Sequence, residues 1–141
     1  NEKQKFSKVN ADIKCCIIRD PIKRFLSAYK NRVLYHKDKL FYKHSVNQII
    51  NKLIENKFEN PHFLPQVFFL GYDINYYNFY CNVDEIEKFA TFINNFFEQN
   101  IVFPKIQTGS TKEKISLSKD QIVKLNEIYK EDYKLISSSR K

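Results

Sequence analysis

A short continuous run of apolar residues between positions 12 and 19 is the first structured segment that the hydrophobic pattern predicts. Runs of this length are typical of strands buried on both faces of a parallel sheet. Asp20 and Pro21 follow the run and indicate the start of a helix, because aspartate caps free backbone N–H groups and proline suits the first helical position. Apolar residues then recur at helical spacing at Ile22, Phe25, Leu26, Tyr29 and Val33. The pattern predicts a strand, a tight turn and an amphipathic helix.

Three further helices are predicted by pairs of capping residues, three positions apart, ahead of apolar residues at helical spacing. The pairs are Ser45 with Gln48, Asp84 with Glu87, and Ser118 with Gln121, the last opening one helix that runs through Tyr133. Between the second and third helices, an aromatic-rich segment contains two predicted short strands, at 67–70 and 76–80. Helices separated by apolar strands indicate an α/β fold.

The composition is that of one globular domain. The chain has 141 residues, of which 43% are hydrophobic and 16% aromatic, enough to bury one core. It contains no internal repeat, no low-complexity tract and no linker rich in glycine or proline, so residues 1–141 are predicted to form a single domain. The chain begins with Asn1 and contains no methionine, which leads us to expect that it starts inside a longer reading frame.

The net charge of +8 favours anionic partners, but it does not decide between nucleic acid, acidic lipid headgroups and a phosphorylated nucleotide. Because the charged residues are dispersed along the chain, a lysine-rich composition explains part of the excess equally well. No run approaches the roughly 20 apolar residues of a membrane span, and the chain does not open with a signal peptide. We therefore expect no membrane span, and no feature of the sequence predicts an oligomeric state.

The three cysteines do not have the spacing of a metal site. Cys15 and Cys16 are adjacent in the first apolar run and Cys81 lies in another, without a C-x-x-C or Cys/His pattern. Buried free thiols in a reducing compartment are the simplest account, so we expect no bound metal and a cytoplasmic location. The Golgi lumen is the alternative location if a segment ahead of Asn1 carries a membrane anchor.

The turn between the first strand and the first helix is a candidate anion site, because a helix start presents free backbone N–H groups and the positive end of the helix dipole. Arg19, at the strand end, carries forked donors that match a phosphate. Ser27, eight residues later, lies two turns into the helix on its polar side, and Lys23 and Arg24 raise the local potential. The alternative is structural: Arg19 pairs with Asp20 or another acid, and Ser27 is a solvated helix residue.

The segment 17–29, with the sequence IIRDPIKRFLSAY, resembles the 3'-phosphate-binding motif of the sulfotransferases that use 3'-phosphoadenosine 5'-phosphosulfate (PAPS), especially their carbohydrate-modifying branch. In that family the arginine at this strand end and the serine eight residues later grip the 3'-phosphate of the nucleotide. The resemblance therefore implies that Arg19 and Ser27 bind PAPS, the sulfate donor. Arg24 matches a typical family residue of the same helix, and the resemblance implies a supporting role for it.

The segment 60–66, with the sequence NPHFLPQ, is similar to the His-aromatic-x-Pro-Gln element of carbohydrate sulfotransferases, with Phe63 where tryptophan is common. Pro61 and Pro65 predict an extended path, and loops held in this way often carry function. His62 is a weak candidate for the catalytic base, because the pKa of histidine lies near neutrality; a structural or positioning role is favoured. The resemblance implies a carbohydrate hydroxyl as the acceptor.

The C-terminal part is also similar to this family. A basic loop at 107–114 precedes the last helix, and the segment 129–135, YKEDYKL, is similar to the closing helix of the family. In relatives a loop near this position approaches the nucleotide, so the resemblance makes Lys112 and Lys114 weak candidates for binding its phosphates. Two surface lysines without a ligand are the favoured interpretation.

The resemblance implies a partial three-layer α/β/α domain of the phosphate-loop type, rich in helix and with a short parallel sheet. The family's first strand and its phosphate loop have no counterpart here, because the only glycines, Gly71 and Gly109, lie far downstream. We expect the parent protein to move a sulfuryl group in line from PAPS to a hydroxyl. This chain is expected to carry the 3'-phosphate-binding half, to bind adenosine 3',5'-bisphosphate weakly, and to be inactive alone.

Two other functions stay open at this point. A basic nucleic-acid-binding module accounts for the charge and for the tyrosines at 72–80. It leaves the strand that leads into Arg19 unexplained, and no recognised nucleic-acid motif is present, so we expect no nucleic-acid partner. A degenerate relative that keeps the fold without the transfer chemistry is the third possibility, which the missing phosphate loop permits.

Overall fold

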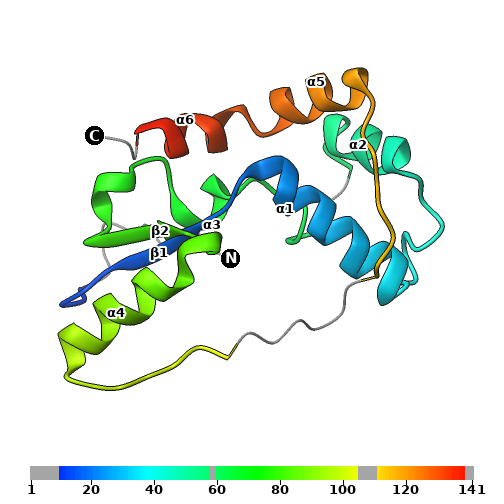
Figure 1. The fold of residues 1–141 in the computed structure, drawn as a ribbon. Helices are drawn as coiled ribbons and strands as arrows, with labels where there is room; N and C mark the ends of the chain where they lie inside the picture. Colours follow the sequence, from blue (N-terminus) through cyan, green and yellow to red (C-terminus); the bar gives the residue numbers. More distant parts are fainter. Residues whose placement is uncertain (1–9, 58–59, 105–110, 139–141) are drawn as a thin grey trace.

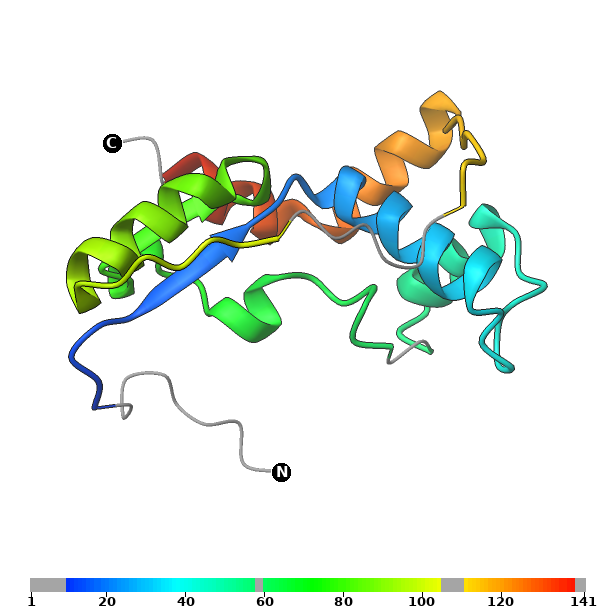
Figure 2. The same ribbon diagram turned by 60° about the horizontal axis from the view of Figure 1, so that its bottom comes forward.

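The computed structural model describes residues 10–57, 60–104 and 111–138. The elements follow in the order β1 (Cys15–Ile18), α1 (Pro21–Ala28), the π-helix η2 (Tyr29–Tyr35), α2 (Val46–Ile54), α3 (Val67–Leu70), the 3-10 helix η3 (Ile74–Tyr76), β2 (Phe79–Asn82), the 3-10 helix η4 (Val83–Glu85), α4 (Ile86–Phe97), α5 (Lys119–Ile128) and α6 (Lys130–Ser138). Figures 1 and 2 show an elongated arrangement, with the sheet towards one end and α2 and α5 towards the other.

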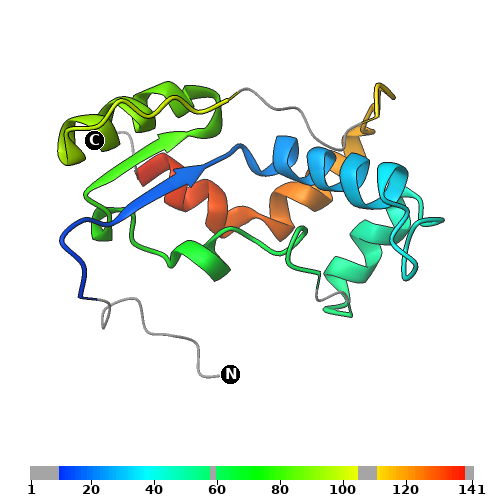
Figure 3. The same cartoon turned by 90° about the horizontal axis from the view of Figure 1, so that it is seen from below.

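The two strands form a parallel sheet in which Cys15 pairs with Phe79. Successive side chains of a strand point to opposite faces. On one face Phe79 stacks on Phe92 of α4, with ring centroids 4.4 Å apart. The other face belongs to a core cluster of Cys16, Ile18, Val67, Ile74 and Leu135. The sheet therefore lies between α4 on one side and α3 and α6 on the other, as Figures 1 and 3 show.

A second core cluster joins α1, η2, α2 and α5. Its buried members are Phe25, Ala28, Tyr29, Val33, Phe41, Ile49, Ile50, Leu53, Phe63, Leu125 and Tyr129. Phe63 comes from the segment between α2 and α3 and meets the ring of Phe25 edge to face, with centroids 5.6 Å apart. Edge-to-face pairs add to the stability gained from burial. This cluster anchors the segment that leads from α2 back to the sheet.

The first strand, turn and helix are confirmed. Asp20 caps α1 by accepting a hydrogen bond from the backbone N–H of Lys23 at 2.8 Å, and Pro21 is the first helical residue. The boxes that cap α2 and α5, at Ser45 and Ser118, are also as predicted. One prediction for β1 is wrong: Ile17 is 36% exposed, so the strand is not buried on both faces.

The prediction of a strand at 67–70 is wrong, because these residues form the short helix α3. The carboxylate of Asp132, far along the chain, accepts hydrogen bonds from the first free N–H groups of this helix, at Gln66 and Val67. Gly71, at φ 77°, ends the helix in the left-handed region, which costs glycine little. The strand predicted at 76–80 is displaced: 74–76 is a 3-10 helix, and β2 begins at Phe79.

Two predictions about helix ends are also corrected. The capping box ahead of α4 is formed by Asn82 and Glu85 rather than by Asp84 and Glu87, because the chain leaves β2 through a 3-10 turn. The predicted last helix breaks at Tyr129 into α5 and α6, which contact different elements, α2 and α3 respectively. The break lets one segment pack on both core clusters.

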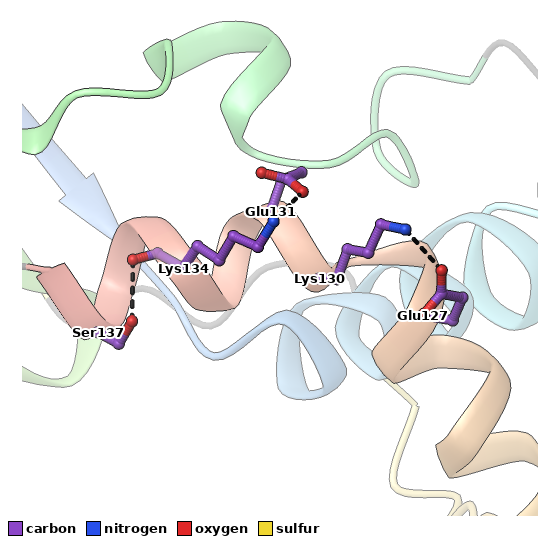
Figure 4. A network of polar contacts seen from close by, with 5 residues as sticks. All are labelled: Glu127, Lys130, Glu131, Lys134 and Ser137. Atoms are coloured by element: carbon purple, nitrogen blue, oxygen red, sulfur yellow. Dashed lines mark hydrogen bonds and ion pairs between the residues drawn. The ribbon is translucent and has the colours of Figure 1, made fainter.

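The exposed side of this last pair of helices is lined by ion pairs. Lys130 pairs with Glu127 at 2.6 Å and Lys134 with Glu131 at 2.7 Å. Figure 4 shows both pairs. Exposed pairs contribute little, because water screens them. The position of α6 therefore depends on its buried residues, Leu135 and Asp132. No helix in the described ranges has both the length and the apolar character needed to cross a bilayer.

Candidate functional site

The site begins at the exit of β1, where the backbone of Arg19 is held by one side chain. Gln66 Oε1 accepts a hydrogen bond from the N–H of Arg19 at 3.0 Å, and Gln66 Nε2 donates to the carbonyl oxygen of Arg19 at 2.8 Å. Two bonds from one amide resemble the pairing of a neighbouring strand. They extend the order of the strand to the residue that precedes the helix cap.

The Arg19 side chain is half-buried, and its Nε atom is fully buried with no hydrogen-bond partner in the described part of the chain. No carboxylate of residues 10–57, 60–104 or 111–138 forms an ion pair with it. A buried N–H of a charged group is costly when it lacks an acceptor. The structural alternative, in which Arg19 pairs with Asp20 or another acid, is therefore not what these residues show.

Arg19 and Ser27 line the same pocket, with a volume of about 300 Å³. The full lining is Arg19, Arg24, Ser27, Ala28, Asn31, Pro61, His62 and Phe69. Ser27 reaches the pocket from the second turn of α1, as its spacing from the helix start predicts. The structure thus brings four of the candidate residues, Arg19, Arg24, Ser27 and His62, around one cavity.

Arg24 lies in the pocket wall but is engaged with the backbone opposite. Its Nη1 donates to the carbonyl oxygen of Leu64 at 2.5 Å and its Nη2 to that of Pro61 at 3.2 Å. Burial lowers the pKa of its guanidinium, the charge of Asp132 opposes this, and the neighbouring Arg19 lowers it further. Arginine stays charged at neutral pH nevertheless. Arg24 therefore fixes the His62 loop and adds positive potential to the cavity.

His62 lies at the exposed rim of the pocket. Its backbone N–H donates to Asn60 Oδ1 at 3.0 Å, which shapes the start of the loop. Partial burial lowers the pKa of its imidazole, and the positive charges of Arg32 and Arg24 lower it further. The ring is therefore neutral at neutral pH and able to accept a hydrogen bond or a proton.

The two lysines ahead of α5 are not part of this arrangement. Lys112 and Lys114 are exposed, and neither lines the pocket. The rest of the predicted basic loop, at 107–110, lies outside the described residues. The geometry thus agrees with the interpretation of Lys112 and Lys114 as surface lysines.

Asn31, Phe69 and Asp132 also belong to the site or its support, and sequence reasoning missed them. Asn31 follows Ser27 by four positions, and this spacing places both on one helical face, a pattern that was available in the sequence. Phe69 reaches the pocket because 67–70 is a helix rather than a strand. Asp132 lies in a run of charged residues that are mostly exposed. No pattern in the sequence therefore predicts that its side chain is only 1% exposed.

The donors in the pocket suit a phosphate. Two guanidinium groups, a hydroxyl, a side-chain amide and an imidazole line it, and none of the lining residues is a carboxylate. Arginine offers phosphate several N–H groups in a fixed geometry. In the described ranges no three His, Cys, Asp or Glu residues are grouped as a metal site would require. A phosphate group is the ligand chemistry that this donor set favours.

Comparison with known proteins adds one finding. A family model described as "Sulfotransferase family" matches residues 1–136, nearly the whole chain. A search of curated proteins and a search of solved structures each found no match. The match includes Arg19, which follows β1, and Ser27 of α1.

Proposed function

Because the chain belongs to the sulfotransferase family, we propose that it serves the transfer of a sulfuryl group from PAPS to a carbohydrate hydroxyl, and that its pocket holds the 3'-phosphate of PAPS. The observation that carries this proposal is the convergence of Arg19 and Ser27 on one pocket, none of whose lining residues is a carboxylate. A phosphate oxygen is the kind of acceptor that the forked donors of a pocket-lining arginine suit.

Each polar group has a distinct part in the proposed site. Arg19 donates its N–H groups to the 3'-phosphate, and Ser27 donates its hydroxyl from the second turn of α1. Arg24 already donates to two backbone carbonyls, so its part is to hold the loop and to supply charge. The two guanidinium groups also repel each other, which lowers the pKa of Arg24 and which a bound dianion would relieve.

We place the hydroxyl group that accepts the sulfuryl group at the rim of the pocket, beside His62. His62 has a neutral imidazole that orients an acceptor hydroxyl by hydrogen bonding, and removal of the hydroxyl proton is the second role open to it. The resemblance of 60–66 to the carbohydrate branch supports a sugar as the acceptor. Bound PAPS supplies the sulfuryl group that the acceptor oxygen takes up. The exposed ring of Phe69 provides an apolar wall beside these polar groups.

The glycine content limits what this chain does by itself. A loop that wraps a phosphate closely with its amides needs glycine, and the chain has only Gly71, which ends α3, and Gly109. We therefore assign to it the 3'-phosphate-binding half of the reaction, with nucleotide binding but no sulfate transfer by the chain alone. A cytoplasmic location stays a prediction, drawn from the cysteines.

The test compares two ligands that differ by one phosphate. Isothermal titration of adenosine 3',5'-bisphosphate and of adenosine 5'-monophosphate measures what the 3'-phosphate contributes. In the wild type we expect the bisphosphate to bind about a hundredfold more tightly, since charged hydrogen bonds contribute about 1.5 to 3 kcal/mol each. Arg19→Ala should reduce this ratio to below about tenfold. Lys23→Ala, which removes one charge from an exposed site on the same helix, is the matched control and should keep the ratio.

Equal affinity of the wild type for the two nucleotides would refute the proposed site. Binding to oligonucleotides that falls steeply with salt and ignores Arg19→Ala would favour a nucleic-acid module. Sulfate transfer from PAPS by the chain alone would contradict the proposal that it binds the nucleotide without transferring sulfate.

A further inference from the structure

A buried carboxylate stands behind the site without touching the pocket. Asp132 of α6 is 1% exposed, and its Oδ2 accepts hydrogen bonds from Gln66 N at 2.8 Å and from Gln66 Nε2 at 3.4 Å. Its Oδ1 accepts from Val67 N at 3.0 Å. Burial raises the pKa of Asp132, while these hydrogen bonds lower it. The carboxylate thus holds both the backbone and the side chain of Gln66.

Gln66 in turn holds the backbone of Arg19, whose side chain lines the pocket. It is 6% exposed, and its amide makes two hydrogen bonds to the backbone of Arg19 across 47 positions of sequence. The contact with Asp132 fixes which end of the amide carries the N–H groups, so that Oε1 faces the N–H of Arg19. A chain of hydrogen bonds therefore runs from α6 through Gln66 to the exit of β1.

We infer that Gln66 and Asp132 are positioning residues, which hold the Arg19 backbone so that its guanidinium meets the 3'-phosphate. This inference rests on the proposed function of the pocket. Sites that bind by directed hydrogen bonds work only when their supporting residues fix the geometry closely. Neither residue lines the pocket, so neither contributes a direct contact. Their effect on the ligand passes through Arg19.

The first variant, Gln66→Glu, turns this arrangement into a measurable pH dependence. A protonated carboxyl at this position still donates one hydrogen bond and accepts another, and so still pairs with the Arg19 backbone; an ionised one loses the donor. Burial and the charge of Asp132 favour protonation of the introduced carboxyl, whereas Arg19 and Arg24 favour ionisation. Tyr129 and Tyr133, the other titratable groups that interact with Asp132, stay neutral over this range, since burial raises the pKa of each.

The expected result concerns the affinity for adenosine 3',5'-bisphosphate. Between about pH 6 and about pH 8, the affinity of Gln66→Glu should fall about tenfold more than that of the wild type, which corresponds to the loss of one well-placed hydrogen bond. Comparison with the wild type over the same pH range removes the effect of the ligand's own titration. A lower Tm with the pH profile of the wild type would overturn the inference, and a fall that persists in Arg19→Ala would assign the pH dependence to repulsion between the introduced carboxylate and the phosphate.

Coupling to Arg19 provides the second readout. In the background of Arg19→Ala, measured at low salt where the remaining affinity is largest, Gln66→Glu should cause no further loss. In the background of Ser27→Ala its effect should persist, because Ser27 is placed by α1. Additive losses with Arg19→Ala would overturn the inference while leaving the proposed function intact. No binding by the wild type would overturn both.

A second variant covers the case in which Gln66→Glu does not fold. Asp132→Asn keeps the shape of the side chain but leaves one oxygen to accept the bonds that two oxygens accept now. We expect the bisphosphate affinity to fall several-fold, and this loss should also vanish in the background of Arg19→Ala. Unchanged affinity in the folded variant would overturn the part assigned to Asp132.

Discussion

Arg24 and Leu64 are joined by a hydrogen bond of 2.5 Å between the guanidinium Nη1 and a backbone carbonyl oxygen, across 40 positions of sequence. With the second bond from Arg24 to Pro61, it ties α1 to the loop that carries His62. These two bonds therefore hold the helix that presents Ser27 against the loop that forms the opposite wall of the pocket. The site depends on this connection as much as on the groups that face the ligand.

The first prediction follows from this connection. Arg24→Ala should lower the free energy of unfolding by about 2 to 4 kcal/mol, because two hydrogen bonds from a charged donor are lost. Arg24→Lys should recover less than half of the loss, since a single ammonium group does not reproduce the planar fork. Urea denaturation measures both variants, with Lys23→Ala as the exposed control. Equal stability of Arg24→Lys and the wild type would contradict the double contact.

A second prediction concerns His62. Its pKa should lie below the usual value of 6.5, because partial burial and the charges of Arg32 and Arg24 disfavour the imidazolium. Saturation with adenosine 3',5'-bisphosphate should raise this pKa, since a nearby dianion favours the charged ring. Titration of the ring by NMR measures both values. At the same ligand concentration Arg19→Ala should show a smaller rise, because less ligand is bound, and an equal rise in that variant would contradict the part assigned to Arg19.

Tyr129 yields a third prediction. Its buried hydroxyl donates to the carbonyl oxygen of Phe63 at 2.7 Å, which holds the middle of the loop between Pro61 and Gln66. Tyr129→Phe should reduce the free energy of unfolding by about 1 to 2 kcal/mol without changing the dependence on denaturant. Tyr72→Phe, at a residue that is 69% exposed, is the control and should stay within about 0.5 kcal/mol. Similar losses in the two variants would contradict the assigned contact.

Cys16 supports a fourth prediction, about pH. Burial raises the pKa of its thiol to about 12, and the neighbouring Cys15 and Cys81 add to the shift. The folded state then holds the proton more tightly than the unfolded state, so stability falls as the pH rises above the ordinary value of 9.0 towards 12. Denaturation at about pH 8 and about pH 10 should show a smaller decline for Cys16→Ala than for the wild type. Rapid alkylation of Cys16 in the folded protein would contradict its burial.

The sequence predicted correctly the elements that depend on neighbouring residues in the chain. The apolar run before Asp20-Pro21 and the capping boxes at Ser45 and Ser118 report helix starts directly, and the structure contains them. The placement of Arg19 and Ser27 around one pocket also follows from the geometry of a helix after a strand. These parts of the fold and of the site depend on residues close together in the chain.

The predictions that were wrong concern elements whose structure depends on residues far away in the sequence. Residues 67–70 carry the composition of a strand, yet they form a helix because Asp132, 65 positions after Val67, satisfies the first backbone N–H groups. The break at Tyr129 likewise depends on distant residues, because α5 packs on one core cluster and α6 on the other. The support given to Arg19 by Gln66 and Asp132 belongs to the same class, since no local pattern marks a buried carboxylate as a partner.

The most direct test of the central claim is a crystal structure of the chain with adenosine 3',5'-bisphosphate. The account predicts an oxygen of the 3'-phosphate within about 3 Å of a guanidinium nitrogen of Arg19 and another within the same reach of the Ser27 hydroxyl. It also predicts that the bonds between Gln66 and the Arg19 backbone are retained. A bound nucleotide whose 3'-phosphate lies outside this pocket, with Arg19 Nε donating to a protein carboxylate, would contradict it.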